Sequence, residues 1–157
     1  MWYMQPIRVS IDVPQTREHV YDFLDVLANH QPFTDHMMRD WRFEGPERGV
    51  GGKASVNAVL GGRTEPVSIE VIAAEPPFSS VERNVGAGGK RVATGTYTLG
   101  ELPTGGTRVA FEYAWQKAPL SERLAAPLVR RLMRPPLEQA MQRLAEQLQA
   151  REPATGP

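Results

Sequence analysis

Apolar and polar residues alternate in several short segments of the chain, and this period of two is typical of strands with one buried face. The first such segment is residues 7–13, with the sequence IRVSIDV. Pro14 ends it, and Thr16 is suited to cap a helix of about 14 residues over 16–29, in which apolar residues recur at helical spacing. Pro32 interrupts the following segment, where we expect a second short helix or an ordered loop.

From Trp41 to Gln116 the chain consists of short alternating segments separated by turns rich in glycine and proline, which predicts a meander of antiparallel strands. One face of each segment is apolar and the other polar, as expected where a sheet covers a core on one side only. The apolar faces contain Ala54, Val56, Ala58 and Leu60 in one segment, Val67, Ile69 and Val71 in the next, and Val109, Phe111, Tyr113 and Trp115 in the last.

Residues 120–150 return to helical spacing, but their apolar residues form two stripes. The upstream stripe contains Leu124, Leu128 and Leu132, and the downstream stripe contains Met133, Leu137, Met141, Leu144 and Leu148. At about 100° per residue, the two stripes point nearly half a turn apart on a straight helix. Because Pro135 and Pro136 lie at the change, we predict a helix that is bent or in two pieces there, with 133–148 gripped by the sheet.

Composition narrows the class of protein. The 157 residues fit one domain, which we assign to 1–150, with a disordered tail at 151–157. Eighteen basic residues balance eighteen acidic ones, so neither nucleic acid nor an anionic bilayer is expected as the main partner. No segment has the pattern of a signal peptide or the ~20 apolar residues of a membrane span, so a cytoplasmic location without stable membrane insertion is expected.

The order of strand, helical pair, antiparallel meander and long C-terminal helix resembles the START-like superfamily, also called SRPBCC, which includes the birch pollen allergen and bacterial polyketide cyclase/dehydrase-like proteins. The resemblance covers residues 7–149. It is carried by IRVSIDVPQTREHVYDFLDVLANH at the start, GTYTLGELPTGGTRVAFEYAW late in the chain and APLVRRLMRPPLEQAMQRLAEQLQ at the end.

This resemblance implies an α+β helix-grip fold, in which about seven antiparallel strands curve around the C-terminal helix. It also implies a cavity between sheet and helix that holds lipids, sterols, quinones, hormones or polyketides. The residues expected to line that cavity lie on the apolar faces and the downstream helical stripe identified above, with Arg83 and Tyr97 as further inward positions. They are Val56, Ala58, Ile69, Val71, Arg83, Tyr97, Phe111, Tyr113, Trp115, Met133, Leu137 and Met141.

Three of these residues carry polar groups. If Val81 and Val85 point inward, Arg83 between them does too, and its guanidinium needs a partner or a ligand oxygen; alternatively it lies at a strand end and reaches water. Tyr97 and Tyr113 share the parity of apolar neighbours, so their hydroxyls bind either a ligand oxygen or the backbone.

Other chemistry is weakly supported. His19 lies opposite the apolar stripe of its helix, while His30 and His36 flank the Pro32 segment close to Asp35 and form either an acid–base or metal pair, or simple loop contacts. The chain has no cysteine, and its glycine clusters at 49–52 and 86–89 lack the context of phosphate-binding loops. No metal or cofactor is therefore expected. The arginines at 130, 131 and 134 form a local basic patch, or a solvated helix face.

Three functions are compatible with this sequence. The first is binding or carriage of a small hydrophobic molecule by a monomer or homodimer, without catalysis. The second is a polyketide cyclase or dehydratase-like enzyme that uses Arg83, Tyr97 and Tyr113. The third is a protein that docks on a partner protein through an edge strand or through Trp2 and Tyr3.

Overall fold

The computed structural model describes residues 3–151, which form one antiparallel sheet and a set of helices. The sheet has seven strands in the order β1-β7-β6-β5-β4-β3-β2. Their bounds are β1 (Ile7–Val13), β2 (Met38–Glu44), β3 (Lys53–Leu60), β4 (Arg63–Glu75), β5 (Ser79–Gly86), β6 (Arg91–Glu101) and β7 (Thr107–Lys117). The helices are α1 (Arg17–Leu24), η1 (Leu27–His30), α2 (Gln31–Thr34), η2 (Ala87–Gly89), α3 (Leu120–Leu124) and α4 (Ala126–Ala150).

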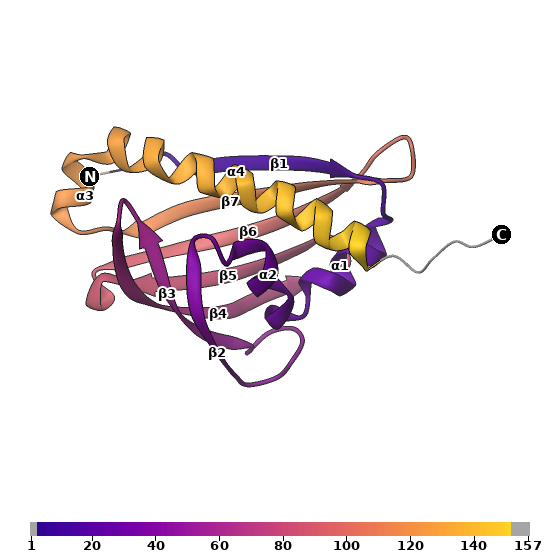
Figure 1. The fold of residues 1–157 in the computed structure, drawn as a ribbon, viewed down its shortest axis with the longest axis horizontal. Coiled ribbons are helices and arrows are strands. Elements are labelled where there is room, and N and C mark those ends of the chain that lie inside the picture. The colour runs from indigo at the N-terminus through magenta and orange to yellow at the C-terminus, as the bar shows by residue number, and fades with distance from the viewer. Residues whose placement is uncertain (1–2, 152–157) are drawn as a thin grey trace.

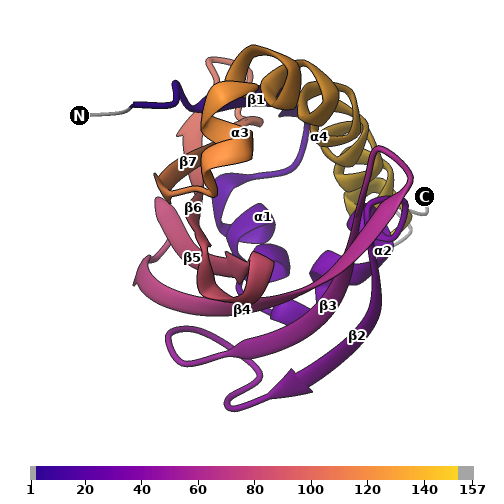
Figure 2. The same ribbon diagram turned by 90° about the vertical axis from the view of Figure 1, so that its left-hand side faces the viewer.

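The sheet curves strongly (Figures 1 and 2). One edge strand, β1, contacts α4, and the other edge strand, β2, contacts α2, which packs against α4. Seen from one end, the strands and α4 enclose a common interior in which the main apolar core lies (Figure 2). This arrangement confirms the predicted α+β helix-grip fold, with its antiparallel meander and its short helices after the first strand.

The first helical segment differs in detail from the prediction. Thr16 caps α1 by accepting a hydrogen bond from the backbone N–H of His19 at 3.3 Å, as its sequence position indicates. The predicted single helix over 16–29 is instead divided, because α1 ends at Leu24 and the extended backbone of Val26 separates it from η1. This division turns η1 and α2 toward the interior of the sheet, where His30 and Phe33 are buried.

The C-terminal helical segment is interrupted at a different residue from the one predicted. The chain is interrupted at Ala125, between α3 and α4, and α4 continues through Pro135 and Pro136 as one helix. The downstream stripe is gripped as predicted: Met133 is partly buried, and Leu137, Met141, Leu144 and Leu148 are buried. The upstream stripe does not turn toward the sheet, since Leu124, Leu128 and Leu132 are 78%, 56% and 45% exposed.

The tail predicted at 151–157 falls mainly outside the described residues. Arg151, its first residue, lies at the end of α4, with its guanidinium carbon 4.9 Å from the ring centre of Phe23. Trp2, the other terminal residue considered above, also lies outside the described part, whereas Tyr3 is 77% exposed. Among residues 3–151, no helix is long and apolar enough to cross a membrane.

Candidate functional site

The central strand β5 directs polar side chains into the interior. Glu82 and Asn84 are buried, whereas Arg83 between them is exposed and lies 3.5 Å from the carboxylate of Glu70 on the outer face. The inward position expected for Arg83 is therefore wrong. The inward assignment assumed that Arg83 shares an inward face with Val81 and Val85. Both of these valines are only partly buried, and they lie on the outward side of the strand together with Arg83.

The cross-strand register places these polar groups in the middle of an otherwise apolar surface. Glu82 pairs with Val71 of β4 and with Gly95 of β6, and Asn84 pairs in the same way with Ile69 and Ala93. On the β4 side lies an apolar cluster of Leu27, Ala54, Val56, Ile69 and Val71. On the β6 side lies the larger core that includes α4. The two inward side chains of β5 thus form a polar stripe between two apolar clusters.

Gly95 leaves room for the Glu82 side chain and the Phe111 ring above its own backbone. A Cβ atom at this position would be 2.9 Å from Cε1 and Cζ of Phe111 and 3.1 Å from Oε1 of Glu82. These distances are shorter than carbon contacts in packed proteins, so a larger residue would displace the ring or the carboxyl group. The absence of a side chain at residue 95 therefore fixes where Glu82 and Phe111 lie.

His30 approaches the stripe from η1, opposite the sheet. Its Nε2 lies 2.7 Å from the carbonyl oxygen of Leu24, and its Nδ1 lies 3.9 Å from Oε2 of Glu82. Because a carbonyl oxygen only accepts hydrogen bonds, Nε2 must carry a proton. In the neutral ring, Nδ1 is then an acceptor that faces the carboxyl group across a gap too long for a direct hydrogen bond.

Burial shifts the pKa values of this pair in opposite directions. Burial raises the pKa of Glu82 from 4.5 to about 7, against a hydrogen bond from Asn84 that lowers it. Burial lowers the pKa of His30 from 6.5 to about 4, although the hydrogen bond to Leu24 favours the protonated ring. At neutral pH the imidazole is therefore uncharged, and the carboxyl group titrates near the pH at which acid–base chemistry needs it.

Tyr97 completes the polar group from β6. It is buried, its ring centre lies 5.4 Å from that of His30 and 4.8 Å from that of Phe111, and its inward position confirms the parity deduced from the sequence. Burial, followed by the nearby Glu82, raises the pKa of Tyr97 well above 10. Its phenol therefore stays protonated and is able to donate a hydrogen bond.

Two buried polar atoms in this part of the sheet have no hydrogen-bond partner among the described residues. They are Oδ1 of Asn84 and Nε1 of Trp115. Asn84 and Trp115 lie in one row across the sheet, because both are paired with Ala93, which stands between them. Buried polar groups are usually satisfied, so two unsatisfied groups on either side of a small residue mark a place suited to an external polar group.

The other predicted lining residues divide between the two apolar clusters. Ile69 and Val71 of β4 and Val56 of β3 are buried on the β4 side of the stripe, and Ala58 is partly buried further along β3. Phe111, Trp115, Leu137 and Met141 are buried in the larger core, with Tyr113 and Met133 packed against it. Burial raises the pKa of Tyr113 to about 12, so this phenol is also protonated. The sequence therefore identified apolar residues on both sides of the stripe but missed Glu82, Asn84 and the inward role of His30.

His36 has a separate structural role. Its Nε2 lies 2.8 Å from the carbonyl oxygen of Pro136, and its Nδ1 lies 2.8 Å from Arg143, whose guanidinium also binds Asp35 at 2.7 Å. These contacts attach α2 to α4 and match the simple loop contacts that the sequence allowed for this histidine. Within residues 3–151 no group of three or more acidic or histidine side chains is arranged to hold a metal ion.

Two surface grooves lie outside the stripe. One, of about 620 Å³, follows the edge of β1 beside α4 and is lined by Arg8, Ser10, Arg134 and Glu138, with Met141 as the only predicted lining residue. The other, of about 590 Å³, is lined by β2, β3 and β4 and includes Arg42, Lys53 and Glu70. Both linings contain several charged side chains, so neither groove matches the apolar space expected between sheet and helix.

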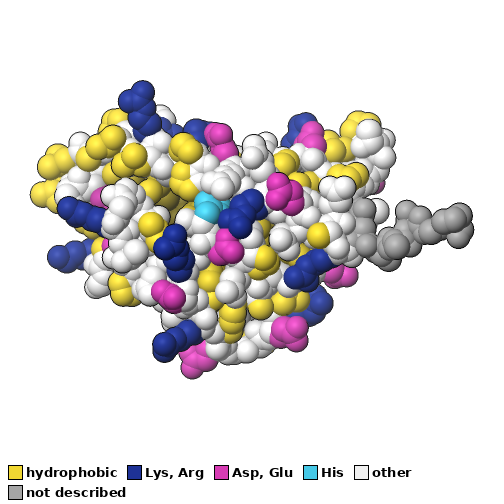
Figure 3. Space-filling view, viewed as in Figure 1, with side chains coloured by type: hydrophobic (Ala, Val, Ile, Leu, Met, Phe, Trp, Pro, Cys, Tyr) yellow, Lys and Arg dark blue, Asp and Glu magenta, His cyan; other side chains and the backbone are white. Residues whose placement is uncertain are grey.

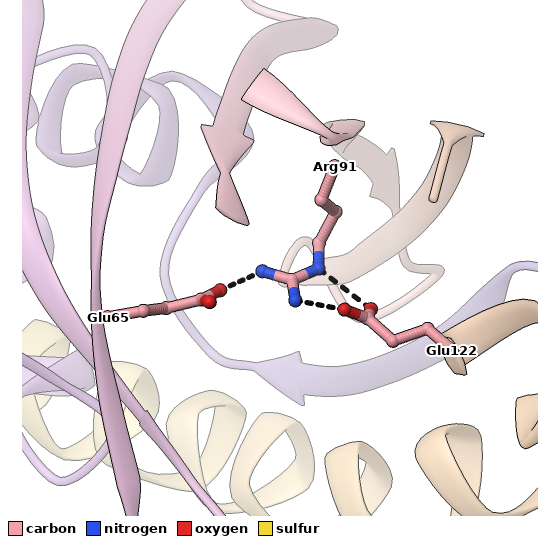
Figure 4. A network of polar contacts seen from close by, with 3 residues as sticks. All are labelled: Glu65, Arg91 and Glu122. Atoms are coloured by element: carbon pink, nitrogen blue, oxygen red, sulfur yellow. Dashed lines mark hydrogen bonds and ion pairs between the residues drawn. The ribbon is translucent and has the colours of Figure 1, made fainter. Parts of the chain in front are cut away.

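An arginine closes one end of the grip (Figure 4). Arg91, the first residue of β6, binds Glu65 of β4 and Glu122 of α3, and the side chain is only 19% exposed. Its pKa is raised by the hydrogen bond to Glu122 and by the charge of that carboxylate, against burial. This network fixes the five-residue helix α3 to the strands of the sheet.

The comparisons with known proteins support the fold. No protein-family model matches the chain, and no curated protein is significantly similar to it in sequence. Solved structures do match. The Zhui aromatase/cyclase from Streptomyces sp. R1128 has a TM-score of 0.75 at 10% identity over 98% of this chain and 99% of that one. A Thermus thermophilus protein gives 0.73 at 21% identity over 95% and 100%, and Ara h 8.0201 gives 0.64 at 13% identity over 94% and 99%.

These matches extend over nearly the whole of each chain, so the architecture is shared from β1 to α4. The shared architecture is the α+β helix-grip fold that the sequence resemblance implied. At these identities the likeness establishes the fold alone. What the chain binds or catalyses must be argued from its own residues.

Proposed function

We propose that the protein binds a small, mostly apolar molecule that carries a hydroxyl or carbonyl oxygen, between the sheet and α4. The apolar body contacts the aromatic and aliphatic side chains of β6, β7 and α4, namely Tyr97, Phe111, Trp115, Leu137 and Met141. The oxygen atom meets the polar stripe of β5. The observation that carries this proposal is the presence of Glu82 and Asn84, buried side by side between two apolar clusters.

The polar stripe lowers the stability of the fold, which supports a role for it in binding. A buried carboxyl or amide destabilises a fold unless it is hydrogen-bonded, and Oδ1 of Asn84 has no partner among the described residues. Trp115 offers an unpaired donor two strands away. A ligand with one accepting and one donating oxygen would satisfy both groups while its rings bury apolar surface.

Thermal stabilisation by matched compounds tests the proposal. We expect 2-naphthol and hydroxylated anthraquinones to raise the melting temperature, and naphthalene and unsubstituted anthraquinone to raise it much less. Asn84→Leu should weaken binding of the hydroxylated compounds about tenfold, because one hydrogen bond to a buried group is lost. It should leave the effect of the unsubstituted compounds unchanged.

Arg83→Met is the matched control, since Arg83 is next to Asn84 on the same strand but faces outward. It should bind every compound as the unmodified protein does. If no compound raises the melting temperature, or if Asn84→Leu binds the hydroxylated compounds as tightly as the control, the proposed binding site is wrong.

The pKa of Glu82 favours a second candidate, an enzyme of the cyclase or dehydratase type. With a pKa of about 7, the Glu82 carboxylate is suited to remove a proton from carbon next to a ligand carbonyl, and the protonated Tyr97 is suited to donate a hydrogen bond to the carbonyl oxygen. The similarity to an aromatase/cyclase adds support. Arg83, assigned to polarise the carbonyl on sequence grounds, faces the wrong side for this role.

Proton exchange separates the two candidates. An enzyme should accelerate exchange of the α-hydrogen of a bound aryl ketone with D₂O, and Glu82→Gln should abolish this acceleration while the ketone still raises the melting temperature. A simple binding protein should show the melting shift with no acceleration in either form. Acceleration that persists in Glu82→Gln would exclude Glu82 as the base.

A further inference from the structure

The outer face of α3 and the first part of α4 carries an exposed apolar stripe. Leu120, Leu124, Leu128 and Leu132 are 60%, 78%, 56% and 45% exposed and recur every four residues across the two helices. Figure 3 shows the hydrophobic side chains of this end of the molecule gathered in one patch with Lys and Arg at its rim. Leucine is normally buried, and four exposed leucines in register mark an interaction surface.

Positive charge coincides with the stripe. Residues 120–134 contain Arg123, Arg130, Arg131 and Arg134 against the single acid Glu122, and Glu122 is already bound to Arg91. The remainder of α4 has the opposite character, with Glu138 and Glu146 against Arg143, and Glu138 lies 3.6 Å from Arg134 at the boundary between the two parts. Although the whole chain is electrically neutral, this half of the helical face has a net charge of +3.

We propose that this stripe docks the protein on the surface of an anionic lipid bilayer. A helix that lies in a bilayer interface has leucines on one face and basic residues near them. Here the exposed Arg131 directly precedes Leu132 in the stripe, while Arg130 and Arg134 hydrogen-bond the backbone carbonyls of Gln5, Pro6 and Arg8 and keep their positive charge. The leucines enter the headgroup region, Arg131 binds lipid phosphates or serine carboxylates, and the positive charge of the segment adds attraction to the anionic surface. This peripheral contact requires no spanning helix.

The charge pattern favours lipid over a second copy of the chain. Pairing two copies through the leucines would bring together two identical segments of net charge +3, which repel each other. A bilayer containing anionic lipid offers complementary charge over the whole patch. The docked end is also the end that Arg91 closes, because Arg91 binds α3 (Figure 4).

Binding to vesicles tests this inference without any knowledge of the interior ligand. We expect the full chain to sediment with vesicles of phosphatidylcholine containing phosphatidylserine, and not with vesicles of phosphatidylcholine alone. Raising the salt concentration to about 0.5 M should weaken binding, because the attraction is electrostatic. Arg131→Gln should weaken it about fivefold, and the double variant Leu124→Ser, Leu128→Ser at least tenfold.

Matched controls use residues of the same types elsewhere on the surface. Arg42→Gln changes an exposed arginine on β2, and Val50→Ser changes an apolar residue that is 57% exposed; both should bind as the unmodified protein does. No sedimentation with the anionic vesicles, or equal binding by the double leucine variant, would overturn the proposal. So would a dimer in solution that the leucine variant converts to a monomer, because the stripe would then be an interface between copies.

Discussion

Nδ1 of His30 faces Oε2 of Glu82 at 3.9 Å, while Nε2 of the same ring is held by the carbonyl of Leu24. The Leu24 carbonyl therefore fixes the proton of the neutral ring on Nε2, and the unprotonated Nδ1 is the atom that faces the Glu82 carboxyl group. A protonated Glu82 faces an acceptor, and an ionised Glu82 faces no cation, since burial keeps His30 neutral. The site is thus more compatible with an uncharged carboxyl group than with a carboxylate.

This relationship predicts how stability depends on pH. The pKa of Glu82 rises on folding from 4.5 to about 7, so its favourable contribution is fully present below pH 4.5 and is lost as the pH rises through 7. Glu82→Gln remains uncharged throughout. We expect the free energy of unfolding of the unmodified protein, relative to Glu82→Gln, to fall by about 3 kcal/mol between pH 4.5 and 8.

Urea unfolding at several pH values measures this difference. His30 contributes in the opposite sense, because its lowered pKa gives stability above pH 6.5 that is lost as the pH falls toward 4. Comparing the two proteins at each pH cancels the contribution of His30, which both contain. A difference that does not change with pH would show that Glu82 is not buried in the way described.

Gly95 provides a test of packing beneath the site. Gly95→Ala places a methyl group against the Phe111 ring and the Glu82 carboxyl, so we expect a loss of about 1–3 kcal/mol in the free energy of unfolding. Gly100→Ala is the control, since it lies on the same strand with no atom within 4 Å of the added Cβ. Equal stability of the two variants by urea unfolding would contradict the close contacts at residue 95.

The sequence predicted most of the fold because periodicity reports which residues face a core. It failed on β5, where the buried residues are polar and the outward Val81 and Val85 resemble a buried face. The hairpin register contained the missing information. Val85 pairs with Val92 next to the turn, so the inward Tyr97 pairs with Ser80, and Glu82 and Asn84 share its face. Pattern alone favours apolar residues inside, and a polar functional stripe reverses that rule.

The prolines of α4 show a second limit of sequence analysis. Pro135 and Pro136 each remove a donor, and the carbonyls four residues earlier belong to Arg131 and Leu132. Both of these residues are exposed, so water can satisfy their carbonyls and the helix continues. The two apolar stripes therefore keep their opposite directions. The upstream leucines stay outside, against the general tendency of leucine to be buried.

The division of α4 into a gripped and an exposed part is testable with one pair of substitutions. Leu144 is fully buried, so Leu144→Ala should lower the free energy of unfolding by about 2–5 kcal/mol. Leu132→Ala, on the same helix at 45% exposure, should change it by less than about 0.5 kcal/mol. Similar losses in the two variants would mean that the upstream stripe is also packed against the protein.

The network around Arg91 predicts a local effect at the closed end of the grip. Arg91→Met leaves Glu65 and Glu122 without their shared partner, at side-chain exposures of 35% and 19%. Because both acids are partly solvated, we expect a moderate loss of about 1–2 kcal/mol in the free energy of unfolding. The larger effect should be on α3, which has five residues and is too short to persist without tertiary contacts.

Hydrogen exchange locates this effect. In Arg91→Met the amides of α3 should exchange faster, while those of β7 and the downstream part of α4 should keep their protection. Arg108→Met removes an exposed ion pair with Asp12 on the outer face and should change neither region. If α3 stays protected in Arg91→Met, its position is set by packing of the chain around it. If protection instead falls throughout the sheet, Arg91 supports the whole fold and does not act as a local closure.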